Sequence, residues 1–399
     1  MANKLIILIC FIFYCGVCNA APVISTISSA SIADNDSISL TGSGFGSNDL
    51  DIKWLGGSSG NIESGTSGAD VSLPSNWYSD STTSEQQAPA YSTARAHSGS
   101  KSIMCSYPQV SQYISEFGYH ATSTFSKLYA TWWVYYDRGA SPMGGQWKQW
   151  RCRPTYTNLN DNCNGEIMRS VWKNADGSHY QAYIMVFCNA ADYGQCYEDG
   201  TGDSRWTGSE PFDQWYRVEV YLQASSTDGN NDGAVILNIY DQSNTVAVKW
   251  NHTALVTRLA GGDSWEYFHF ENFFGNDLGD GGDGTSEKIY YDDVYLQMGS
   301  RAHVEIGNAS TYSSCTHTEI QYPTVYNGTG ITFTVNQGSF ENGSTAYVFV
   351  IDEDGNANAT GEAITFGAAS EPTQNGKSTL NSNNPKSIIT SNNGLTLLK

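Results

Sequence analysis

Apolar and polar positions alternate with a period of two along two neighbouring stretches, residues 128–136 and 148–153. Because successive side chains of a β-strand point to opposite faces, this alternation predicts two strands, each with one core face. Their other faces combine aromatic rings with amide and guanidinium groups, a mixture that suits stacking and hydrogen bonding to a sugar polymer. The first stretch places Leu128, Ala130, Trp132, Val134 and Tyr136 on one face and Tyr129, Thr131, Trp133 and Tyr135 on the other. The second stretch sets Gln149, Arg151 and Arg153 against Lys148, Trp150 and Cys152.

Short runs rich in β-branched and aromatic residues recur along the whole chain, separated by clusters of Gly, Asn, Asp and Ser. Apolar positions at helical spacing are nearly absent, so the pattern predicts an all-β protein. In the central part we expect strands at residues 128–137, 146–153, 166–173, 179–188, 214–223, 234–241, 264–273 and 288–297.

Two distant segments carry the pattern of a smaller sandwich. Residues 22–48 predict two strands followed by the turn GSGFG, and residues 301–366 predict five more strands. The first segment resembles the opening of an immunoglobulin-like sandwich of the plexin and transcription-factor (IPT) type. It is too short to bury a core alone. We therefore expect one discontinuous sandwich, residues 21–52 plus 299–367, with residues 53–298 inserted as a second domain. The alternative is that the N-terminal strands pack on the insert.

The insert has motifs of its own. The run HSGSKSI at residues 97–103 resembles the early strand of concanavalin A-like jelly rolls, and IYYDDVYL at residues 289–296 resembles their closing strand. The resemblance implies an all-β fold, a concanavalin A-like jelly-roll sandwich plus a smaller immunoglobulin-like sandwich. It implies no single function, because this architecture occurs in lectins, glycosidases and polysaccharide lyases.

The chain is strongly acidic, with 40 acidic and 20 basic residues and a formal net charge of −20. Such a surface repels nucleic acid and anionic membranes, so we expect neither as a partner. Residues 1–20 combine an early lysine, a short apolar run and small residues before the expected cleavage site, the pattern of a signal peptide. We expect a secreted, extracellular or periplasmic protein with no membrane attachment after cleavage. Residues 368–399 are polar and low in complexity, which predicts a disordered tail.

Cysteine use agrees with export. Nine cysteines occur in the chain, and removal of residues 1–20 leaves six. An even number in an exported protein predicts disulfides, and the close spacings favour the pairs Cys152/Cys163 and Cys188/Cys196. A zinc site is the alternative, but residues 21–399 contain no CxxC pair, which disfavours it.

A candidate sugar-binding face follows from the alternation. Sugar-active jelly rolls use their concave sheet, and Lys148, Arg151 and Arg153 form the one dense basic cluster of the sequence. We expect a polysaccharide as the partner of this face. The residues assigned to it are Tyr129, Trp133, Tyr135, Lys148, Gln149, Arg151, Arg153, His179, Gln181, Tyr183, Trp265, Tyr267 and His269.

The same face contains residue types that β-elimination on a uronic-acid polymer needs: a carboxylate neutraliser, a base and an acid. By resemblance to jelly-roll lyases, Arg151 or Gln149 would neutralise, His269 would act as base, and Tyr183 or Tyr267 as acid. The alginate-lyase signatures Q-[IV]-H and Y-F-K-A-G-x-Y are absent, as is the E-x-D-x-x-E run of retaining glycosidases. We therefore rank non-catalytic polysaccharide binding first, lyase activity second and a structural or adhesive role third.

Acidic positions also predict a structural calcium ion, because carboxylate oxygens are ligands that calcium prefers. The candidates are Asp292 and Asp293 on the expected closing strand and Asp277 in the run GNDLGDGGDG. No organic cofactor is expected.

Overall fold

The computed structural model describes residues 20–56, 61–80, 88–106, 113–137, 146–154, 166–173, 180–189, 194–198, 213–258, 265–270, 273–274, 288–367, 390–391 and 394–395. In this part of the chain, regular structure is almost entirely β-strand, which confirms the all-β prediction. The helical pieces described are α1 (Asn61–Ser64) and the 3-10 turn η2 (Tyr312–Ser314). Among these residues, no helix is both long and apolar enough to cross a membrane.

The chain divides into two compact units, Met1–Gly367 and Ala368–Lys399. In the second unit, β27 (Thr390–Ser391) pairs with β28 (Gly394–Leu395). The segment predicted to be a disordered tail therefore contains one strand pair. Everything described below belongs to the first unit.

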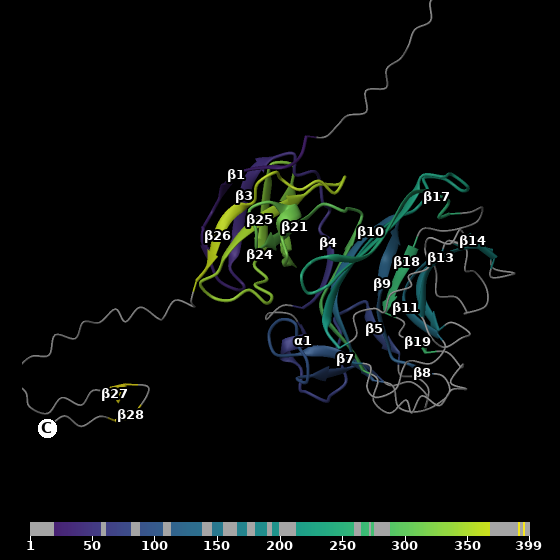
Figure 1. Cartoon of the computed structure of the whole chain (residues 1–399), viewed down its shortest axis with the longest axis horizontal. Coiled ribbons are helices and arrows are strands. Elements are labelled where there is room, and N and C mark those ends of the chain that lie inside the picture. Colours follow the sequence, from purple (N-terminus) through teal and green to yellow (C-terminus); the bar gives the residue numbers. More distant parts are fainter. Residues whose placement is uncertain are drawn as a thin grey trace, which may run out of the picture. The chain divides into compact units, whose positions relative to one another are not determined.

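The smaller sandwich of the first unit has two sheets. One sheet has the order β1 (Val23–Ile27), β3 (Ser37–Ser43), β24 (Gly330–Thr334), β23 (Tyr322–Asn327). The other has the order β2 (Ser31–Ile32), β26 (Glu362–Phe366), β25 (Thr345–Ile351), β21 (His303–Gly307), β22 (Thr318–Ile320). Each sheet therefore joins strands from both ends of the unit, through the pairs β3–β24 and β2–β26, and Figure 1 shows these strands as purple and yellow-green ribbons side by side.

One hydrophobic cluster fills this sandwich. Leu40 of β3 is the Cα partner of Ile331 in β24, and both side chains are buried. Phe45, from the GSGFG turn, is completely buried in the same cluster as Val348 and Phe366. Apolar faces of the N-terminal and C-terminal strands thus cover one another, so neither segment buries its core residues without the other.

The larger sandwich also has two sheets. The β10 sheet has the order β17 (Val246–Leu255), β16 (Gly233–Tyr240), β15 (Trp215–Gln223), β10 (Lys127–Asp137), β20 (Lys288–Met298), β7 (Ser102–Ser106), β6 (Ala90–Ser92), with β4 (Asp51–Leu55) paired to β20. The β11 sheet has the order β14 (Gly194–Glu198), β13 (Tyr180–Asn189), β12 (Ile167–Lys173), β11 (Gln146–Arg153), β18 (Trp265–Phe270), β9 (Glu116–Phe125), β5 (Trp77–Asp80). At its margin, β19 (Phe273–Phe274) pairs with β11 and with β8 (Tyr113–Ile114).

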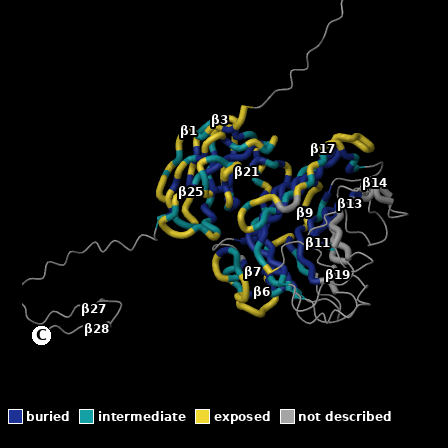
Figure 2. Tube along the Cα trace, viewed as in Figure 1, coloured by how far each residue is buried: buried dark blue, intermediate teal, exposed yellow. Residues whose placement is uncertain are grey.

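The core lies between these two sheets. Trp132 of the β10 sheet packs edge-on against Phe270 of the β11 sheet, with ring centroids 5.0 Å apart. Trp150 stacks on Phe268 within the β11 sheet. Figure 2 shows the buried segments running along the strands, with exposed positions gathered at turns. The alternation in β10 therefore assigns its core face correctly: Leu128, Ala130, Trp132, Val134 and Tyr136 are all buried there.

The core also contains Cys152, which is completely buried as a free thiol. Burial raises the pKa of this thiol well above its usual value. The structure does not support the predicted disulfide Cys152/Cys163: the Cys152 thiol is free and points between the sheets, and Cys163 lies outside the described residues. The side chains of Cys188 and Cys196 lie outside the described part of the chain, so that pairing stays a prediction.

Candidate functional site

A polar row crosses the outer face of the β11 sheet. Arg151 of β11 is the Cα partner of His269 in β18, and Arg153 is the partner of Tyr267. Cross-strand partners point to the same side of a sheet, and the intervening residues Cys152 and Phe268 point into the core. The structure thus brings four of the residues assigned from the sequence together on one face.

The two arginines share one carboxylate. Arg151 Nη1 lies 3.2 Å from Glu166 Oε1, and Arg153 Nε donates to Glu166 Oε2 at 2.9 Å. Arg151 and Arg153 are 8% and 6% exposed, and Glu166 is 1% exposed. The two guanidinium groups therefore lie side by side at one buried carboxylate on this face.

His269 is held by two partners from neighbouring strands. Its Nδ1 lies 2.8 Å from Glu116 Oε1 of β9 and is also hydrogen-bonded to the Tyr78 hydroxyl of β5. Because a carboxylate only accepts hydrogen bonds, the contact with Glu116 favours the tautomer that has its proton on Nδ1. Nε2 is then the basic nitrogen of the ring.

Gly118 makes the contact with Tyr78 possible. It is the Cα partner of both Tyr78 and His269, and so it lies between them in the row. A Cβ at position 118 would lie 2.9 Å from the Tyr78 hydroxyl oxygen and 2.8 Å from the Phe268 carbonyl oxygen. Only the absence of a side chain lets Tyr78 lie across β9.

Tyr267 and His120 form the more exposed end of the site. Their rings are stacked with centroids 4.0 Å apart and an interplanar angle of 10°. The His120 side chain is 48% exposed. Burial raises the pKa of Tyr267, and the carboxylate of Glu266 raises it further.

Three aromatic residues assigned to this face lie elsewhere. Tyr129, Trp133 and Tyr135 belong to β10, which is in the other sheet. Tyr129 stacks on His303 of the smaller sandwich, and Trp133 Nε1 donates to Glu319 at 3.3 Å. Their predicted place beside Arg151 is wrong, because alternation separates the two faces of a strand but does not indicate which sheet the strand joins.

The predicted placement of Gln149 and Trp265 on this face is also wrong. The pairing of β11 with β12 shifts register between Lys148 and Trp150, which leaves Gln149 as an extra residue. Its amide oxygen accepts from Arg169, and it lines a small cavity among core side chains. Trp265 precedes a register shift in β18 and is buried in the core cluster. Such irregularities reverse the assignment of faces.

The remaining assigned residues are less informative. Lys148 is half-buried and pairs with Phe273 of β19, farther along β11 than the Arg151 row. Gln181 and Tyr183 belong to β13, but their side chains are outside the described part, as are the whole of His179 and Asp277. The roles predicted for these residues stay predictions.

Asp292 and Asp293 hold the loop before β7. Asp292 Oδ2 accepts from the backbone N–H groups of His97 and Ser98, at 2.8 and 3.2 Å. Asp293 Oδ2 lies 3.1 Å from His97 Nδ1, and Asp293 Oδ1 accepts from the Ser98 hydroxyl at 3.0 Å. Burial and the neighbouring carboxylate raise the pKa of Asp292 well above its usual value. A calcium ion at these residues stays a prediction.

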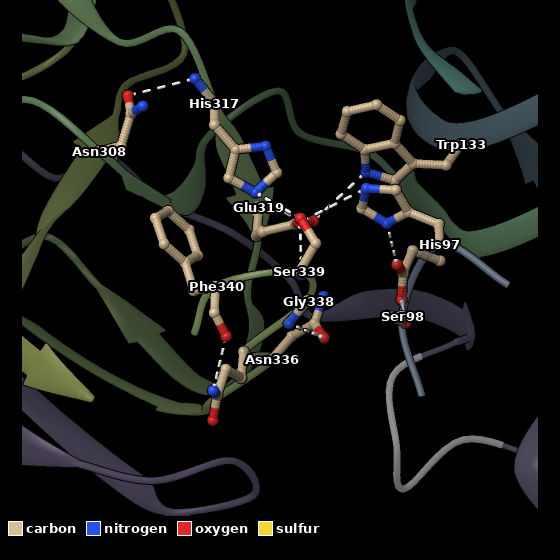
Figure 3. Close-up of polar contacts among 12 residues, drawn as sticks. His97, Ser98, Trp133, Asn308, His317, Glu319, Asn336, Gly338, Ser339 and Phe340 are labelled. Carbon is tan, nitrogen blue, oxygen red and sulfur yellow. Dashed lines mark hydrogen bonds and ion pairs between the residues drawn. The ribbon is translucent and has the colours of Figure 1, made fainter. Parts of the chain in front are cut away.

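The other side of His97 faces the smaller sandwich. Figure 3 shows the rings of His97 and His317 on opposite sides of the Glu319 carboxylate. His317 Nε2 lies 2.8 Å and His97 Nε2 3.7 Å from Glu319 Oε1. Burial alone would raise the pKa of Glu319, but the two imidazoles hold it down at about 2. Burial opposes the charge of His97, yet Glu319 and Asp293 raise its pKa.

Sequence reasoning missed Tyr78, Glu116, His120 and Glu166. Tyr78 and Glu116 lie on strands that join the β11 sheet from an earlier part of the chain, and Glu166 lies just before β12. The alternation of Glu116, Gly118 and His120 along β9 was a usable signal, since all three belong to one face.

No protein-family profile and no curated protein matches the sequence. Solved structures with similar folds include an alginate lyase of family PL-14 from Aplysia kurodai, at 15% identity and a TM-score of 0.39, covering 53% of this chain and 87% of that one. Lectin II from Ulex europaeus matches at 11% identity and a TM-score of 0.37, covering 63% and 99%. A mixed-linkage glucan GH16 protein from Bacteroides ovatus matches at 12% identity and 0.38, covering 57% and 96%.

Proposed function

We propose that the outer face of the β11 sheet binds an acidic polysaccharide. The observation that carries this proposal is that two guanidinium groups, those of Arg151 and Arg153, lie side by side on one sheet face of a chain with net charge −20. Guanidinium groups form two parallel hydrogen bonds with a carboxylate, so the uronate group of a sugar suits them.

The neighbouring rings support the same partner. The Tyr267 and His120 rings are stacked beside Arg153, and the His120 side chain is 48% exposed. A pyranose ring is flat and apolar on its faces and polar at its rim, and aromatic side chains beside polar ones complement both parts.

A second candidate function, cleavage by β-elimination, is favoured by the contacts of His269. Glu116 orients the ring so that Nε2 is basic, and Tyr78 and Tyr267 supply hydroxyl groups nearby. In such a reaction His269 takes the proton on C5 of the uronate while Arg151 stabilises the carboxylate. The C4–O4 bond then breaks, a C4–C5 double bond forms, and a tyrosine protonates the leaving oxygen.

Binding is tested by retention of the full chain on immobilised alginate and glucuronan, with the neutral glucan laminarin as comparison. We expect retention on the uronic-acid polymers that weakens as salt is added. Arg151→Gln should weaken binding about 10-fold or more, because a charge-assisted hydrogen bond is lost. Lys249→Ala, which removes an exposed positive charge from the other sheet, is the matched control.

Two results contradict the binding proposal. One is equal retention of the Arg151→Gln and Lys249→Ala proteins. The other is binding of laminarin as tight as that of alginate. Because Arg151 is buried, the thermal melting of each variant is measured first, and His120→Ala provides a second variant at an exposed position.

Cleavage is tested by the ultraviolet absorbance of unsaturated uronide products. If the second function holds, wild-type protein produces this absorbance, and His269→Gln abolishes it while retention on the polymer persists. If wild-type protein produces none from any uronic-acid polymer that it retains, the lyase proposal fails and the binding proposal stands.

We also propose that the protein is exported, on the pattern of residues 1–20. N-terminal sequencing of protein recovered from the culture medium or periplasm tests this. A mature N-terminus at residue 21 is the expected result.

A further inference from the structure

We propose that His97, Asp293 and Glu319 bind a divalent transition-metal ion of the zinc class between the two sandwiches. This site is separate from the polysaccharide face and does not depend on it. One ligand atom from each of the three residues lies within 4.8 Å of the others. No motif in the sequence indicates this group, because its members lie far apart in the chain.

Three separate parts of the fold supply the ligands. His97 comes from the loop before β7, Asp293 from β20 of the larger sandwich, and Glu319 from β22 of the smaller one. His97 Nδ1 lies 3.1 Å from Asp293 Oδ2, and Nε2 lies 3.7 Å from Glu319 Oε1. Tetrahedral zinc, with bonds of about 2.0–2.1 Å, separates its ligand atoms by about 3.4 Å. The two observed separations run to different nitrogens of the His97 ring, so an ion bound by one ring nitrogen requires one of the two carboxylates to move closer to it.

The ligand types select the class of ion. Calcium takes about 6–8 oxygen ligands, whereas an imidazole with two carboxylates is a set that zinc binds. Zinc commonly has three protein ligands and one water molecule. The donor set therefore favours zinc over the calcium ion that the acidic pattern alone predicts.

Further contacts hold the ligands in place. The Ser98 hydroxyl donates to Asp293 Oδ1 at 3.0 Å, and the Ser339 backbone N–H donates to Glu319 Oε1 at 3.1 Å. His317 Nε2 lies 2.8 Å from the same Glu319 oxygen. The His97 ring stacks on Trp133 with centroids 3.8 Å apart and an angle of 13°. Partners of this kind orient metal ligands and are a usual part of such sites.

Charge gives a reason for a cation. Asp293 is 1% exposed and the Glu319 side chain 0%, so two carboxylates are removed from water close together. Burying like charges is costly unless a cation compensates them. A divalent ion neutralises both carboxylates from one place, whereas protons do so only when both His97 and His317 hold one. A proton and a metal ion thus compete for His97.

The test uses the untagged full chain, stripped with a chelator and passed through a desalting column. We expect zinc titration by calorimetry to find about one ion per chain and to raise the melting temperature. Magnesium and calcium at equal concentration should give no comparable shift. Cobalt(II) should produce the visible absorbance of a four-coordinate ion bound by nitrogen and oxygen.

Substitutions test which residues bind the ion. His97→Gln and Glu319→Gln should abolish stoichiometric zinc binding, and His252→Gln, which removes a histidine of β17, should leave it intact. Absence of stoichiometric binding to wild-type protein, with no cobalt absorbance, overturns the proposal. So does equal loss in the His252→Gln protein. If the site variants fail to fold, the cobalt spectrum of wild-type protein alone decides between the two results.

Discussion

Gly118 shows how one missing side chain allows a contact between distant strands. Tyr78 reaches His269 across the backbone of β9, at a point where a Cβ would lie 2.9 Å from its hydroxyl oxygen. The alternation of polar residues along β9 indicates a face, but not that a tyrosine from β5 lies over it. Contacts of this kind depend on which strands are neighbours, and a single sequence does not contain that information locally.

Gly118→Ala should lower the free energy of unfolding by about 1–3 kcal/mol, because the new methyl group overlaps Tyr78 and the Phe268 carbonyl. Denaturant titration measures this change. Gly328→Ala is the control, since the nearest atom to a Cβ there is 3.7 Å away. Equal stability of the two variants would mean that Tyr78 does not lie over Gly118.

At the scale of strands, the sequence predicts on which face of a strand a side chain lies better than it predicts which strands are adjacent in a sheet. The core faces of β10 and β11 follow from alternation alone, and Arg151, Arg153, Tyr267 and His269 meet as their parity indicates. The same rule misplaces Gln149, because a register shift interrupts β11. It also joins β10 to the wrong sheet. Tertiary packing decides both the register shift in β11 and the sheet that β10 joins, and neither changes the period of the hydrophobic pattern.

The two motifs that resemble strands of a concanavalin A-like jelly roll, residues 97–103 and 289–296, are in direct contact. The backbone and hydroxyl of the His-Ser pair at 97–98 bind the carboxylates of Asp292 and Asp293. Asp293 has a positive φ of 48°, at a register shift between β10 and β20. An aspartate tolerates this conformation better than a β-branched residue does. The motifs therefore have a structural reason to occur together.

Glu166 is the residue that fixes β11 to the start of β12. Glu166→Gln should lower the free energy of unfolding by about 3–5 kcal/mol, because it leaves two buried guanidinium groups without their shared carboxylate. Asp228→Asn removes an ion pair of the same 2.9 Å length that is partly exposed, and should cost less than about 1 kcal/mol. Urea denaturation compares them, and similar losses would contradict the assignment.

At the scale of the first unit, buried charges connect the two sandwiches. Arg217 of β15 donates through Nη1 to Glu305 Oε1 of β21 at 3.0 Å, and the Tyr312 hydroxyl donates to Glu305 Oε2 at 2.9 Å. Burial opposes the charge of Glu305, but Arg217 and His303 hold its pKa well below the usual range. The all-β class was predictable from the sequence, whereas this buried pair was not, since its members lie 88 residues apart.

Acid should therefore weaken the contact between the sandwiches. A depressed pKa stabilises the folded state at pH values above the unfolded pKa of about 4.3, and this stabilisation is lost as the pH falls further. Glu305→Gln should be less stable than wild type at neutral pH, by about 3 kcal/mol or more. The difference should shrink on acidification to about pH 3.

Urea midpoints at several pH values measure this change. Asp51→Asn, at an exposed ion pair with Lys53, is the control and should follow the wild-type profile. A constant difference between wild type and Glu305→Gln at every pH would contradict the role of Glu305.

The sharing of one sheet by β3 and β24 has a consequence for the order of synthesis. Ser39 and Thr332, which are hydrogen-bonded across these strands, are 293 residues apart. A ribosome that has made β3 must add the whole larger sandwich, and then β21 to β23, before β24 emerges. During that time the edge of β3 that later pairs with β24 has no partner strand. The apolar face of β3, with Ile38 and Leu40, is also not yet covered by the C-terminal strands. The larger sandwich can form first. The smaller one closes last, and a chain stalled before β24 exposes a strand edge open to aggregation.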